Sequence, residues 1–106
     1  MRILLDESVP RHLKSLLPDH ETATVVECGW GSIENGELLA RGAEQFDVFI
    51  TADQKIPNQQ HLASFDIAVV VLVAPTNTMV HYSPMAELIR DAVGSAVRGE
   101  ALWVTP

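Results

Sequence analysis

With 106 residues, 47% of them hydrophobic and 20% charged, the chain can form one modest core, and we expect a single domain over residues 1–106. Fourteen acidic against seven basic residues give a net charge of −7, which counts against nucleic-acid binding by phosphate neutralisation unless a metal or a partner contributes. The longest apolar stretch, 67–74, has eight residues, far fewer than the roughly 20 that span a membrane. The pattern at residues 1–5 is that of a strand, so we expect no secretory leader. We expect a cytoplasmic protein with no membrane contact.

Short apolar runs alternate with stretches of helical periodicity along the chain. In chain order they predict a strand over 2–5, a helix from Pro10 to Leu17 capped by Ser8, a strand over 23–26, a helix from Asn35 to Phe46, a strand over 47–51, a short helix from Pro57 to Phe65, a strand over 67–73, a loop up to Tyr82, a helix from Ser83 to Ala96 and an edge strand over 101–104. In the last helix, Leu88 belongs to the expected apolar stripe.

Strands separated by helices predict a mostly parallel sheet covered on both faces, which is a three-layer α/β/α sandwich. In such sheets ligands bind beyond the carboxyl ends of the strands, where successive connections leave in opposite directions. If the first strand lies between the second and the third, Asp6 and Asp53 flank that point. The sequence therefore predicts a crevice between these two acids.

Carboxylates gathered in such a crevice suit a divalent cation. Mg²⁺ or Mn²⁺ takes oxygen ligands, orients a phosphate and lowers the pKa of an attacking water. Asp6 and Asp53 are the principal candidate ligands and catalytic acids, Glu37 is a plausible third, and Glu7 either joins them or faces solvent. Taken singly, Asp6 is equally well explained as a cap or turn acid, and Asp53 as the acid of an Asx turn before Pro57.

Several short motifs together resemble the small PIN-like proteins of the DUF5615 group. The resemblance runs from residue 1 to about residue 74, and its motifs are ILLDESVP at 3–10, GWG at 29–31, NGELL at 35–39, FDVFITAD at 46–53 and PNQQ at 57–60. It implies a PIN-like α/β fold and, for active relatives, a Mg²⁺- or Mn²⁺-dependent ribonuclease, often the toxin of a toxin–antitoxin pair. Carried over by position, Asp6 and Asp53 would bind the metal, with RNA as substrate and an antitoxin protein as partner.

The chain departs from the nuclease pattern at two positions. Asn35 stands where related chains commonly have an acid, so that Glu37 would have to replace it, and Lys55 stands where many relatives have a further aspartate. A lysine ammonium there competes with a cation for the carboxylates, but it could also hold a phosphate. Asn35, Lys55 and Thr51 are the candidate substrate contacts.

Two other classes of protein remain open. The acids after the first and third strands, with Asp53 four residues before Pro57, also resemble the site of a phospho-receiver domain. Such a domain stabilises its phosphoryl group with a hydroxyl after the fourth strand, which Thr76 could supply, and with a lysine after the fifth strand, which this chain lacks. The third class is a non-catalytic PIN-like interaction module with a degenerate site, which Asn35, Lys55 and the acidic charge would suit. Trp103 on the expected edge strand makes a homodimer conceivable.

Overall fold

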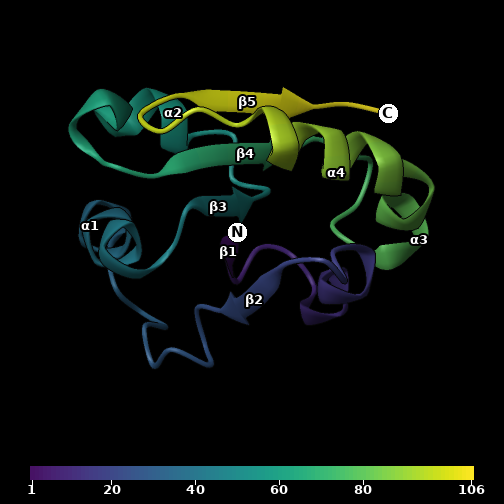
Figure 1. Ribbon diagram of the computed structural model, residues 1–106, viewed down its shortest axis with the longest axis horizontal. Helices are drawn as coiled ribbons and strands as arrows, with labels where there is room; N and C mark the ends of the chain where they lie inside the picture. Colours follow the sequence, from purple (N-terminus) through teal and green to yellow (C-terminus); the bar gives the residue numbers. More distant parts are fainter.

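The computed structural model describes all 106 residues and has an α/β fold with a five-stranded, all-parallel sheet in the order β2-β1-β3-β4-β5 (Figure 1). The strands are β1 Arg2–Leu5, β2 Glu21–Thr24, β3 Val48–Thr51, β4 Ala68–Leu72 and β5 Ala101–Val104. The expected α/β class is confirmed, and so is the position of β1 between β2 and β3.

Two longer helices and several single turns connect the strands. The α-helices are α1 Asn35–Gln45, α2 Ile56–Gln59, α3 Met79–Tyr82 and α4 Ala86–Ser95, and the 3-10 turns are η1 Arg11–Leu16, η2 Leu62–Ser64 and η3 Ser83–Met85. Figure 1 shows α1 and α2 on one side of the sheet and α3 and α4 on the other. None of these helices combines the length and hydrophobicity needed to cross a lipid bilayer.

The core is divided by the sheet into two apolar layers, because successive strand residues point to opposite faces. In β1, Ile3 and Leu5 pack with Leu13 of η1 and with the α3–α4 side, whereas Leu4 packs with the α1 side. All five residues of β4 are buried, as expected for an interior parallel strand. This arrangement confirms three layers.

Five local predictions were wrong. The single helix expected from Pro57 to Phe65 is two short elements, α2 and the 3-10 turn η2, because the backbone is extended at Gln60. Strand β2 covers 21–24 rather than 23–26, since an edge strand takes its register from its neighbour, and Arg2 pairs with Glu21. Pro10, not Ser8, precedes η1, and no side chain caps that turn. Part of the expected loop 74–82 forms α3, because Tyr82 turns into the core. Leu88, expected to face inward, is 46% exposed.

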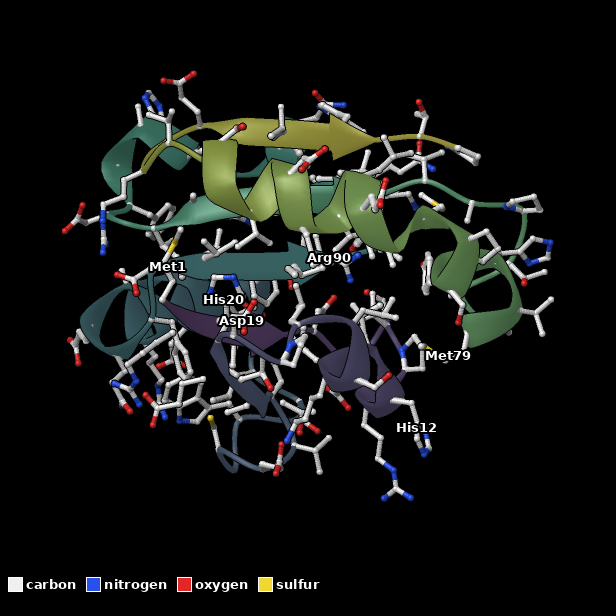
Figure 2. All side chains as sticks on the ribbon, turned by 45° about the vertical axis from the view of Figure 1, so that its right-hand side comes forward. Met1, His12, Asp19, His20, Met79 and Arg90 are labelled. Carbon is white, nitrogen blue, oxygen red and sulfur yellow. The ribbon has the colours of Figure 1, made fainter.

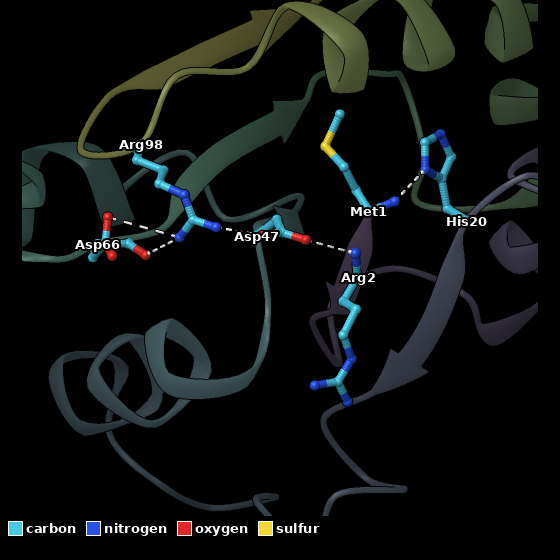
Figure 3. A network of polar contacts seen from close by, with 6 residues as sticks. All are labelled: Met1, Arg2, His20, Asp47, Asp66 and Arg98. Carbon is cyan, nitrogen blue, oxygen red and sulfur yellow. Dashed lines mark hydrogen bonds and ion pairs between the residues drawn. The ribbon is translucent and has the colours of Figure 1, made fainter.

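Polar contacts tie the amino edge of the sheet together (Figure 3). The Asp47 carboxylate accepts the backbone N–H of Arg2 at 2.8 Å and forms an ion pair with Arg98, whose guanidinium also donates to the Asp66 carbonyl at 2.6 Å. The ammonium of Met1 lies 3.4 Å from Nδ1 of His20. These contacts join segments before β1, β2, β3 and β5, and they lie at the edge opposite the candidate acids.

Candidate functional site

Asp6 is held at the carboxyl edge of the sheet by contacts with β3. It directly follows β1, and its backbone N–H donates to the Ile50 carbonyl at 2.9 Å, which continues the pairing of the two strands. Its half-buried carboxylate accepts two hydrogen bonds on the same oxygen, Oδ2, from the hydroxyls of Ser8 and Thr51, both at 2.7 Å. Two neutral donors therefore set the orientation of this acid.

The same two hydroxyls also hold the loop that follows β3. The Thr51 hydroxyl accepts the backbone N–H of Asp53 at 3.0 Å, and the Ser8 hydroxyl accepts that of Ala52 at 2.9 Å. Each hydroxyl thus donates its proton to Asp6 and accepts an amide proton. Thr51 has no exposed surface, so its hydrogen bonds are formed away from water. The loops after β1 and β3 are therefore joined, but the groove that Asp6 lines lies on the β2 side and does not include Asp53, so the crevice expected between the two acids is not the groove found.

Asp53 lies in this joined loop with its side chain half-buried. Its Oδ1 accepts the backbone N–H of Lys55 at 2.9 Å, which is the Asx-turn contact expected before Pro57. The other carboxylate oxygen, like Oδ1 of Asp6, accepts no hydrogen bond from the protein. Both acids therefore have an oxygen free to act as a ligand.

The structure does not gather the remaining predicted residues with Asp6 and Asp53. Glu37 is exposed on α1, where its carboxylate forms an ion pair with Arg41 at 3.4 Å. Glu7 is exposed and extends toward Gly31, and Asn35 begins α1 beside a groove that Glu7 also lines. The Lys55 ammonium, next to α2, has no carboxylate within ion-pair distance.

A divalent cation fits this geometry only as a site of few protein ligands. No group of three or more His, Cys, Asp or Glu side chains is placed to hold a metal ion, so Glu37 and Glu7 do not complete a cluster with Asp6 and Asp53. Mg²⁺ is commonly held by one or two carboxylates, with waters and substrate phosphates as its other ligands. Asp6 and Asp53 each keep a free carboxylate oxygen, which is the type of ligand that such a site uses.

The largest groove of the protein, of about 760 Å³, opens beside Asp6 between η1 and the segment after β2. Its lining residues are Asp6, Glu7, Val9, Arg11, His12, Lys14, Ser15, Thr24, Val25, Val26 and Glu27. Inside it, Lys14 donates to Glu27 at 2.5 Å, and Glu27 also accepts the backbone N–H of Thr24. The hydrogen bond from Lys14, followed by that from Thr24, lowers the pKa of Glu27 from 4.5 to about 2.

Sequence reasoning missed Ser8 and Arg11 as site residues. Ser8 was assigned to a helix cap, although its position two residues after Asp6 would have allowed a turn contact with that carboxylate. Nothing in the sequence indicated that Arg11 would lie in a groove beside Asp6.

The phospho-receiver alternative assigned a role to the hydroxyl of Thr76. In the structure this hydroxyl forms hydrogen bonds with the Thr78 hydroxyl at 2.8 Å and with Nδ1 of His81 at 2.6 Å.

No known protein family matches this chain, and no curated protein or solved structure shows significant similarity to it. The resemblance to PIN-like proteins therefore stays a prediction.

Proposed function

We propose that this protein is a divalent-metal-dependent ribonuclease of the PIN-like type, in which Asp6 and Asp53 hold Mg²⁺ or Mn²⁺. One observation carries the proposal. The Asp6 carboxylate is oriented by Ser8 and Thr51 where the connections of β1 and β3 diverge, and it retains a free oxygen beside the Asp53 loop. Open α/β sheets bind their ligands at this position.

The protein's own residues supply orientation and charge. Ser8 and Thr51 hold Asp6 in one rotamer, so that no reorganisation is needed when a ligand arrives, and Thr51 also positions the backbone of Asp53. A divalent ion bound by the two acids would position a phosphodiester and lower the pKa of a water. Lys55 has no acidic partner, and its ammonium is available to a substrate phosphate.

The test is RNA cleavage over a titration of Mg²⁺ or Mn²⁺, with wild type compared with Asp6→Asn. We expect the substitution to lower the cleavage rate by on the order of 100-fold, because it removes a charged ligand without changing shape. Glu44→Gln, at an exposed position of α1, is the matched control and should cleave like wild type. Equal cleavage by wild type and Asp6→Asn, or no cleavage by either at any metal concentration, would end the proposal.

A non-catalytic interaction module is the second candidate, and it is favoured by the small number of acids at the site. Glu37 is paired with Arg41, and no third carboxylate joins Asp6 and Asp53. In that case the fold would serve a protein partner, such as an antitoxin, without chemistry. Calorimetric titration with Mn²⁺ separates the two candidates: the module predicts the same heat for wild type and Asp6→Asn, and the nuclease predicts a loss of binding in the variant.

A further inference from the structure

Most of the positive charge of this acidic protein is already paired. Four of its seven basic side chains form ion pairs with carboxylates: Arg2, Lys14, Arg41 and Arg98. A fifth, Arg90 of α4, donates to the carbonyl of Leu16 at 3.2 Å, and Figure 2 shows it beneath α4. Arg11 and Lys55 are left with no partner in the protein. Both lie at the carboxyl edge, beside Asp6 and just after Asp53 respectively.

Arg11 is the first residue of η1, and its side chain is exposed along the groove that starts at Asp6. Its neighbour His12 also lines this groove and projects outward from η1 in Figure 2. Lys14 is neutralised there by Glu27, so Arg11 is the one arginine or lysine of the groove that is free to bind an anion. A guanidinium binds phosphate through two parallel hydrogen bonds.

The groove also has one exposed apolar side chain. Of its three hydrophobic lining residues, Val9 and Val25 are buried, and only Val26, which is 65% exposed, presents an apolar surface to a ligand. A volume of about 760 Å³ lies within the roughly 300–1,000 Å³ of small-ligand pockets, which suits unpaired nucleotides better than a duplex. An isolated cation beside an apolar surface matches the phosphate and the base of a nucleotide.

We infer that this groove binds single-stranded RNA next to the reacting phosphodiester, with the Arg11 guanidinium on a neighbouring backbone phosphate. The inference rests on the proposed nuclease function, because it takes Asp6 as the position of the phosphate to be cleaved. It makes Arg11 a substrate-binding residue that the sequence did not identify. Lys55, which follows Asp53, is the second unpaired cation at this edge of the sheet.

Fluorescence anisotropy with a short labelled single-stranded RNA tests this inference. Binding is measured in Ca²⁺ rather than Mg²⁺, so that affinity is recorded apart from cleavage, and is repeated over a series of salt concentrations. Arg11→Ala should weaken binding about fivefold and reduce the slope of log K against log salt by about 0.7, the value for one phosphate contact on a single strand. Arg98→Ala, which removes an arginine at the amino edge of the sheet, opposite the groove, should change neither quantity.

The outcomes separate this inference from the proposed function. If Arg11→Ala binds RNA with the affinity and the salt slope of wild type, the inference is overturned, while cleavage by wild type would still support the nuclease. If wild type binds RNA through Arg11 but never cleaves it, the nuclease proposal fails and the groove assignment stands. Failure of wild type to bind RNA, or preferential binding of an acidic peptide, would also overturn the inference.

Discussion

Thr51→Val tests whether the carboxyl edge is held by the hydroxyls described above. Valine matches threonine in shape and suits a strand, so that the change removes mainly the hydroxyl. That hydroxyl donates to Asp6 at 2.7 Å and accepts the N–H of Asp53 at 3.0 Å, at a position with no exposed surface. A hydrogen bond to a charged acceptor is worth about 1.5–3 kcal/mol, and partial exposure of Asp6 lowers that value. We expect a loss of about 2 kcal/mol in the free energy of unfolding.

Urea unfolding followed by circular dichroism measures this loss. With a slope of about 1.5 kcal/mol/M, typical of small domains, the midpoint should fall by about 1.3 M. Thr22→Val is the matched control, because Thr22 lies in the edge strand β2 and its hydroxyl has no partner in the protein; its midpoint should stay within about 0.3 M of wild type. A Thr51→Val midpoint as high as that of the control would refute the role assigned to the hydroxyl.

Two further predictions concern α1 and the groove. A Cβ on Gly42 would lie 3.2 Å from Cδ2 of Leu4, so Gly42→Leu should lower the free energy of unfolding, measured in urea, by about 2 kcal/mol. Gly94 has open space around it, so Gly94→Ala should raise the free energy of unfolding by about 0.5–1 kcal/mol. Equal effects of the two changes would contradict this packing. The pKa of Glu27, about 2 in the folded protein against an ordinary 4.5, makes folding more favourable above pH 4.5, and this contribution is lost as the pH falls toward 2. Lys14→Met should therefore raise the pKa of Glu27 in an NMR titration, and an unchanged titration would show that Lys14 does not set it.

The sequence alone determined the fold class and the general position of the candidate site. Apolar runs separated by amphipathic stretches require a covered parallel sheet, and the central runs of β3 and β4 are buried as that sheet demands. The carboxyl ends of parallel strands lie at one edge, which is why Asp6 and Asp53 could be assigned to the same region before any coordinates were known. The periodicity of apolar residues and the direction of the chain are local properties, so they can be read from the sequence.

Tertiary structure decided which side chains meet at that edge. Ser8 contacts Asp6 locally, two residues away, but its contact with Thr51 depends on the pairing of β1 with β3, more than forty residues apart in the chain. By contrast, the ion pair of Glu37 with Arg41 is local, because the two residues are four apart on α1, where helical geometry favours such pairs. The groove that exposes Arg11 exists because η1 packs beside the segment after β2. Such long-range contacts arise from packing, so only the folded chain shows them.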